Sequence, residues 1–161
     1  MNANFQINVG DWKTKPAALT RLKPVSGSDY QKLRQCRWKL IKLARERPAC
    51  NAYFLSLPNH RSLTSLLGDS SIWVSLVEPC PFNYGESWEA HNAIGVTALA
   101  LVSGQQQLLA TLVHEFAHIN GVDSSGHSAE LAALACGFGN WKELLTGEDD
   151  PDTPYDPSIN G

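Results

Sequence analysis

The chain has 161 residues, of which 43% are hydrophobic and 18% are charged, and its net charge is −3 at neutral pH. This length and composition are typical of a single globular domain with a buried core. The longest apolar run, residues 94–102, is about half of the ~18 residues that a membrane-spanning helix requires. The opening residues, MNANFQINVGDWK, contain no apolar core of a secretory signal. These observations exclude a membrane protein and favour a cytoplasmic one.

The charge is distributed unevenly along the chain. Residues 1–47 carry a net charge of +8, whereas residues 48–161 carry −11. Such an asymmetry permits a nucleic-acid contact by the basic part. A solvated helix face, partly neutralised by the acidic half, also explains it, and we favour this simpler explanation.

Four cysteines are scattered along the sequence, at Cys36, Cys50, Cys80 and Cys136. No two of them form a CxxC pair, so the spacing argues against a zinc ribbon and predicts no disulfide framework. We expect free thiols, with Cys136 as a small core residue of an Ala/Leu-rich helix.

The first half of the chain predicts an arm, a helix and a strand. Residues 1–27 lack periodicity and contain two prolines, so we expect a loose N-terminal arm. Residues 28–47 place apolar side chains at helical spacing between Lys and Arg, and Pro48 follows, which predicts a basic amphipathic helix. The aromatic run at residues 52–57 is typical of a short strand.

The second half predicts further strands and two helices. Residues 72–77 and 93–101 read as strands, and the turn-rich residues 78–92 between them read as a long loop. A small α+β domain with a short mixed sheet, spanning residues 28–147, accounts for this pattern. Residues 148–161 are acidic and proline-rich, which predicts a disordered tail.

A helix is expected from Ser103 to Asn120. Ser103 and Gln106 match a capping box at its start, and Gly121 occupies the position after its end that favours a left-handed residue. A second helix is expected at residues 128–136. The first helix carries one apolar stripe: Leu108, Leu112, Phe116 and Ile119.

The middle of this apolar helix contains the motif HExxH. His114 and His118 are four residues apart and therefore share one face, with Cβ atoms about 5–6 Å apart. This is how a helix offers two imidazoles to one zinc ion, while Glu115 is directed at the water that zinc activates. Buried without partners, these groups would each cost ~1–3 kcal/mol. A catalytic zinc site with Glu115 as general base explains them.

A catalytic zinc needs a third protein ligand, and the sequence offers several candidates. The metzincin spacing fails because Ser124 stands where a His is required. Asp123 is a weak candidate for an oxygen ligand. Glu130 follows the motif at a shorter distance in sequence than the ligating Glu on the second helix of other zinc sites. We favour His127, because the turn GVDSSG can return the chain to the metal and imidazole suits zinc.

The segment TLVHEFAHINGVDSSGHSAELAALACGFG resembles the active-site segment of SprT-like zinc metallopeptidases, above all their short phage and bacterial versions. These have an HExxH helix, a brief turn, a GH pair and a second helix. The resemblance implies a small zincin-like α+β fold, zinc held by His114, His118 and His127, and Glu115 as the catalytic base. It covers residues 94–139, and the N-terminal half shows no specific match.

The sequence departs from this family in two respects. Many members continue with GHG and an aromatic residue, whereas here Ser128 follows His127 and Leu131 stands nearby. The zinc ribbon that some relatives carry is absent, so their association with DNA is not implied.

We therefore expect a zinc-dependent metalloendopeptidase that acts on a protein or peptide substrate. One alternative is a zinc-stabilised, non-catalytic module that contacts nucleic acid through the basic helix 28–47. Another is an enzyme that hydrolyses a non-peptide amide at the same site. The presence of Glu115 favours catalysis, because a closed structural zinc site has no use for a base. The sequence does not indicate the oligomeric state.

Overall fold

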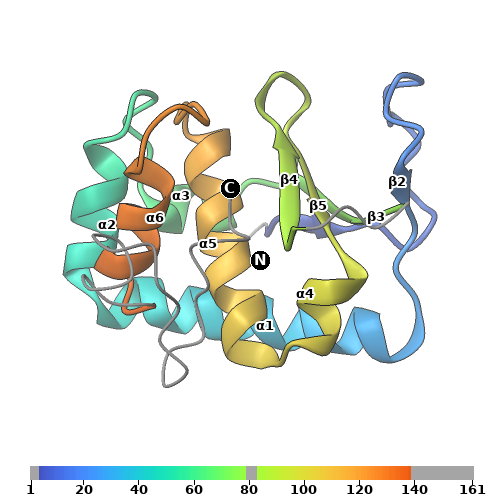
Figure 1. Ribbon diagram of the computed structural model, residues 1–161, viewed down its shortest axis with the longest axis horizontal. Helices are drawn as coiled ribbons and strands as arrows, with labels where there is room; N and C mark the ends of the chain where they lie inside the picture. Colours follow the sequence, from blue (N-terminus) through green and yellow to red (C-terminus); the bar gives the residue numbers. More distant parts are fainter. Residues whose placement is uncertain (1–3, 79–82, 139–161) are drawn as a thin grey trace.

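The computed structural model describes residues 4–78 and 83–138. The strands form one mixed sheet, and a long central helix separates this sheet from a pair of helices on its other side (Figure 1). The expectation of a small α+β domain with a short mixed sheet is confirmed. The architecture places the HExxH helix in the middle of the molecule.

The sheet has five short strands. They are β1 (Gln6–Ile7), β2 (Leu22–Lys23), β3 (Trp73–Val77), β4 (Gly85–Trp88) and β5 (Ala93–Val96). Their order is β1-β3-β5-β4, with β2 also paired to β3. The β1–β3 and β3–β5 pairs are parallel, whereas β2–β3 and β4–β5 are antiparallel. Strand β4 is therefore an antiparallel edge strand.

Six α-helices and one 3₁₀ turn lie within the described residues. They are α1 (Gly27–Glu46), α2 (Pro48–Leu55), α3 (Leu63–Leu67), η1 (Glu89–His91), α4 (Ala98–Val102), α5 (Gln105–Ile119) and α6 (Ser128–Ala135). The basic helix expected at 28–47 is confirmed as α1, and it buries an apolar stripe against the core: Leu33, Cys36, Leu40 and Ala44. None of the described helices has the length and apolar character to span a membrane.

The N-terminal segment is not the loose arm that was expected. Strands β1 and β2 both pair with β3, and Phe5 and Leu22 are fully buried. Trp12 stacks on Trp73 with ring centroids 5.4 Å apart. Short strands need no long hydrophobic period, which is why the sequence pattern missed them. The tail predicted at 148–161 lies outside the described residues.

The strand expected at residues 52–57 is wrong, because this segment belongs to helix α2. Pro48 stands at the first helical position, where its fixed φ favours a helix start. Cys50 and Phe54, four residues apart, are both buried on the same face. A short apolar run is ambiguous between helix and strand, and here the helical period decides.

The region around the third expected strand also differs in detail. Of the strand expected at residues 93–101, only Ala93–Val96 is extended. The Thr97 side chain accepts a hydrogen bond from the Ala100 N–H at 3.2 Å, so helix α4 begins directly after Thr97. Part of the expected loop forms β4 instead. The predicted capping box is wrong as well: Gly104 is the N-cap of α5, and the Ser103 hydroxyl donates to the Leu99 carbonyl.

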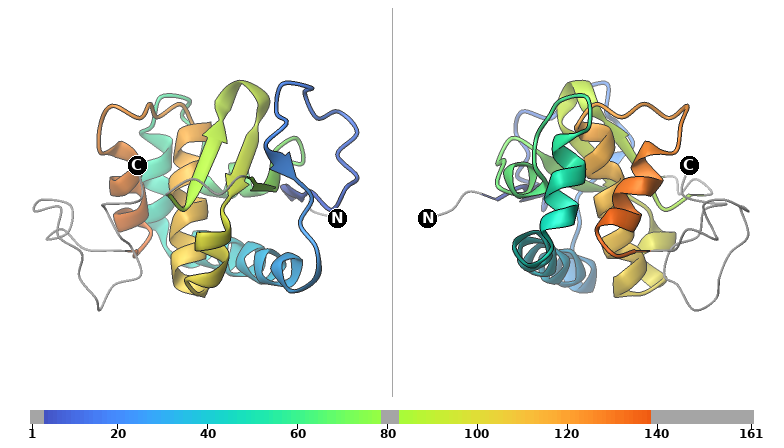
Figure 2. Two further views of the ribbon diagram at one scale, coloured as in Figure 1. Left: turned by 45° about the vertical axis from the view of Figure 1, so that its right-hand side comes forward. Right: turned by 90° about the vertical axis from the view of Figure 1, so that its left-hand side faces the viewer.

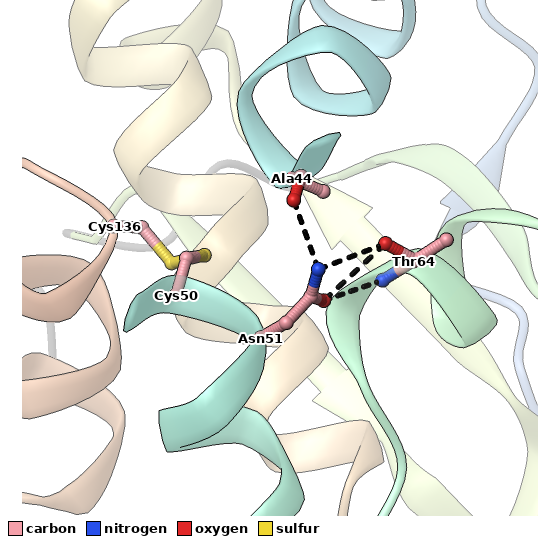
Figure 3. Close-up of a disulfide and its surroundings, with 5 residues drawn as sticks. All are labelled: Ala44, Cys50, Asn51, Thr64 and Cys136. Carbon is pink, nitrogen blue, oxygen red and sulfur yellow. Dashed lines mark hydrogen bonds between the residues drawn. A yellow bond between two sulfur atoms is a disulfide. The ribbon is translucent and has the colours of Figure 1, made fainter. Parts of the chain in front are cut away.

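A disulfide joins Cys50 of α2 to Cys136 at the end of α6, contrary to the expectation of free thiols (Figure 3). The two cysteines are 86 positions apart in sequence and their Cα atoms are 4.5 Å apart. No local spacing could indicate this pair, because packing of the two helices brings it together. Disulfides persist where thiols are not kept reduced, so this bond gives no support to the cytoplasmic location expected from the sequence.

Candidate metal centre

Helix α5 presents the HExxH motif from a buried position. Its C-terminal end follows the prediction, with Gly121 at φ 93° after the cap residue Asn120. The Asn120 side chain is fully buried and donates to the carbonyls of Phe54 and Arg61 at 2.8 and 2.9 Å. It also accepts from the Arg61 N–H at 3.2 Å. These bonds fix the end of the helix next to the motif.

The two motif histidines converge on one point. Their Nε2 atoms are 3.1 Å apart, and His114 is only 1% exposed. Two Zn–N bonds of ~2.0–2.1 Å at a tetrahedral angle would place the nitrogens ~3.3 Å apart, so the spacing fits a shared metal ion. The Nδ1 atom of His118 lies 2.7 Å from the Val122 carbonyl oxygen. Because that oxygen can only accept, Nδ1 carries the hydrogen and Nε2 carries the lone pair, which faces the His114 ring.

Glu115 lies beside this pair and is only 3% exposed. Burial raises the pKa of its carboxyl to about 8, and the nearby carboxylates of Glu86 and Glu130 act in the same direction. A hydrogen bond from the Ser87 side chain opposes the rise in pKa. A carboxylate with this proton affinity can accept a proton near neutral pH.

A cleft of about 360 Å³ opens beside the motif. Glu115 and His118 of α5 line one part of it, and Ser87 and Trp88 of β4 line another. Ser124, in the turn between α5 and α6, lies at its rim. The candidate base and one candidate metal ligand therefore face a space that a substrate can enter, beside the edge strand.

The expected third ligand, His127, is the N-cap residue of α6 and its side chain is exposed. Within the described parts of the chain, no three His, Cys, Asp or Glu side chains gather closely enough to hold a metal ion. The structure thus brings His114 and His118 together but does not bring His127 to them. The assignment of His127 stays a prediction.

The two oxygen candidates differ in their surroundings. Asp123 is exposed and accepts hydrogen bonds from the Ser125 N–H and hydroxyl, which lower the pKa of its carboxyl. Glu130 is partly buried, and its Oε2 atom has no hydrogen-bond partner among the described residues. Burial raises the pKa of Glu130, whereas His127 and His118 lower it. Glu130 therefore lies within electrostatic reach of the site, and Asp123 is occupied by its own turn.

Sequence reasoning missed the contribution of β4. Gly85 lets the strand pass close to Glu115, and a glycine inside a strand can indicate such a close approach. Glu86 forms a two-pronged ion pair with Arg21, at 2.8 and 3.1 Å, which ties β4 to the N-terminal segment. No sequence signal indicates Ser87 as the partner of Glu115, because the contact depends on how the strand packs on α5.

Comparison of the chain with protein-family models, with curated proteins and with solved structures found no match in any of the three. The resemblance to SprT-like metallopeptidases stays a prediction from the sequence.

Proposed function

We propose that the protein is a zinc-dependent hydrolase, and specifically a metalloendopeptidase. One observation carries this proposal: the Nε2 atoms of His114 and His118 lie 3.1 Å apart, beside a buried glutamate at a cleft. A catalytic zinc site of this type has two imidazoles on adjacent turns of a helix. A carboxylate directly after the first imidazole does not bind the metal. A purely structural site would leave Glu115 without a role.

His114, His118 and His127 would hold the zinc ion. The ion, when bound, acts as a Lewis acid and lowers the pKa of a water molecule toward ~7. The hydrogen bond from His118 Nδ1 to the Val122 carbonyl keeps the other ring nitrogen unprotonated and aimed at the site. The ring of His114 is buried, which limits its freedom to reorient.

Glu115 would take a proton from the attacking water and pass it to the leaving amine. Its raised pKa suits both transfers, because the carboxylate must gain and then lose the same proton. The Ser87 side chain donates to this carboxylate and so holds it in position. Burial excludes bulk water, which would otherwise compete for the proton.

The position of β4 supports a peptide substrate over a small non-peptide amide. This strand ends the sheet order and also lines the cleft. An extended peptide can bind an open strand edge through main-chain hydrogen bonds, which fixes the scissile bond relative to nearby groups. A small amide would make no use of such an edge.

Metal analysis with a Glu115→Gln variant tests the proposal. Wild type should carry about one zinc per chain, and Glu115→Gln should keep the zinc but lose hydrolysis of an unfolded protein substrate by at least about 100-fold. Glu46→Gln, an equal change of charge on the exposed face of α1, should leave both unchanged. A wild-type protein without stoichiometric zinc would overturn the proposal.

A second candidate function is a zinc-stabilised module that binds nucleic acid through α1. The observation in its favour is Trp38, whose side chain is 70% exposed on this helix. Arg34 and Lys42, four residues before and after it, are also exposed. An aromatic side chain between cations suits single-stranded nucleic acid, because bases stack on the ring and phosphates pair with the charges.

This second candidate is tested separately from catalysis, because α1 lies at the opposite end of α5 from the motif (Figure 1). Binding of a labelled single-stranded oligonucleotide should weaken with rising salt. Trp38→Ala should weaken it about tenfold, by loss of one stacked base. Glu115→Gln should have no effect on this binding. Equal binding by wild type and Trp38→Ala would exclude the surface.

A further inference from the structure

Glu130 has a buried carboxylate oxygen close to the candidate site. It lies in the first turn of α6, three residues after His127. Its carboxylate accepts a hydrogen bond from its own backbone N–H. The Oε2 atom, however, is buried and has no hydrogen-bond partner among the described residues. An unsatisfied buried acceptor destabilises a fold, so its retention calls for a partner that arrives later.

Glu130 lies within electrostatic reach of the groups of the candidate site. Its negative charge is felt by Glu115, and the charges of His127 and His118 act on it in turn. Helix α6 is held against the rest of the domain at both ends. The Tyr53 hydroxyl donates to the Ser128 carbonyl at 3.0 Å, and the Cys50–Cys136 disulfide closes the other end. The helix that carries Glu130 is thus fixed in place (Figure 2 shows α6 beside α5).

Two imidazoles act on the charge of Glu130, and they differ in their hydrogen bonds to the described residues. The Nδ1 atom of His118 already has the Val122 carbonyl, at 2.7 Å. His127, in contrast, is exposed at the start of the helix that carries Glu130. A metal-ligating histidine almost always donates its other N–H to a carboxylate or carbonyl, which fixes the tautomer and the ring orientation.

We propose that Glu130 is a positioning residue: its Oε2 accepts the ring N–H of His127 and turns the other ring nitrogen toward the ion held by His114 and His118. This inference rests on the proposed zinc site. An exposed histidine loses rotamer freedom when it ligates a metal, and a fixed acceptor nearby reduces that loss. The buried oxygen of Glu130 gains its hydrogen bond in the same step.

Zinc affinity, measured by competition with a chelator of known affinity, tests the assignment without reference to activity. Glu130→Ala should bind zinc about 10–100-fold more weakly than wild type, the usual effect of losing such a partner. Glu130→Gln should recover most of this loss, because its amide oxygen still accepts the N–H. Glu46→Ala, which removes an exposed carboxylate from α1, should bind zinc as wild type does.

Two further measurements separate positioning from direct ligation and from a merely structural role. In a His127→Ala background, Glu130→Ala should cause no further loss of zinc affinity, since it acts through that imidazole. The visible absorption of the Co²⁺ form should be the same in Glu130→Gln as in wild type, because the ligands are the same. Additive losses in the double variant, or a changed Co²⁺ spectrum, would overturn the proposal.

The outcomes also distinguish this inference from the function on which it rests. If wild type binds no zinc, both are wrong. If wild type binds zinc and Glu130→Ala binds it equally well, only the role of Glu130 is wrong. If Glu130→Ala merely lowers the melting temperature of the metal-free protein and leaves zinc affinity unchanged, Glu130 is structural and the inference again fails.

Discussion

Gly85 of β4 lies directly against Glu115 of α5, so that a Cβ atom at residue 85 would be only 3.1 Å from the Cγ and Oε1 atoms of the glutamate. The same Cβ atom would lie 3.0 Å from Cγ2 of Thr111. A Cβ atom at this position would be closer than ordinary van der Waals contact, so its neighbours would have to shift. Gly85 sets how closely the edge strand approaches the candidate base.

The Gly85→Ala variant should consequently lose both stability and activity. Relief of the contact requires a shift of β4 or of the Glu115 side chain, which we expect to cost about 1–3 kcal/mol of unfolding free energy. A displaced base should slow peptide hydrolysis by up to about 100-fold. Zinc content should be unchanged, because the histidines are not touched. Urea unfolding, metal analysis and steady-state kinetics measure the three effects.

Gly126→Ala provides the control for stability, since a Cβ atom there meets no heavy atom within 4 Å. It should unfold at nearly the same urea concentration as wild type. If Gly85→Ala is as stable and as active as wild type, the close approach of β4 has no role in holding Glu115.

The pKa of Glu115 predicts a pH dependence of stability for the metal-free protein. Burial raises this pKa from an ordinary value of 4.5 to about 8, so the folded state binds a proton that the unfolded state has released over that range. Stability should therefore fall as pH rises from about 4.5 to 8, by at most about 1.4 kcal/mol per pH unit. Urea unfolding of metal-free protein at pH 5 and pH 8 measures the change.

Glu115→Gln should flatten this dependence, because the amide carries no charge to bury at high pH. At pH 8 the metal-free variant should accordingly be more stable than metal-free wild type. An equally steep decline in the two proteins would mean that other groups cause it and that Glu115 is not the buried titrating residue.

The HExxH helix could be predicted from sequence because its signals are local. The apolar period, and the glycine at 121 that ends the helix, lie within the segment itself. The prediction of a strand at residues 52–57 was wrong because the aromatic run there fits the period of a strand as well as that of a helix. Packing of Phe54 in the core favours the helix. Local signals suffice where a segment is long and periodic.

The rest of the candidate site depends on contacts between distant segments. Ser87 meets Glu115 only because β4 packs across α5, and Arg21 reaches Glu86 only because β2 pairs with β3. The buried oxygen of Glu130 is likewise a result of how α6 packs. No spacing in the sequence carries this information, since each contact joins residues that are far apart along the chain.

Replacing Asn120 should weaken the end of the helix that carries the HExxH motif. Its side chain donates to the carbonyls of Phe54 and Arg61, so Asn120→Ala leaves one buried and one partly buried carbonyl without these donors. We expect a loss of about 2–4 kcal/mol of unfolding free energy. Asn120→Asp keeps the acceptor for the Arg61 N–H but loses the donors, and it should be nearly as unstable. Urea unfolding of both variants checks this, and a wild-type midpoint for Asn120→Asp would contradict it.

The Cys50–Cys136 disulfide should stabilise the domain by restricting its unfolded chain. For two cysteines 86 positions apart, the chain-entropy relation gives about 4–5 kcal/mol. The Cys50→Ala/Cys136→Ala protein should therefore unfold at a much lower urea concentration than oxidised wild type. A reductant should lower the wild-type midpoint toward that of the double variant, whose own midpoint should not move. Cys36→Ala, which removes a free buried thiol of the described residues, should keep the reductant sensitivity of wild type. A wild-type midpoint that does not respond to reductant under unfolding conditions would show that the two thiols are not joined.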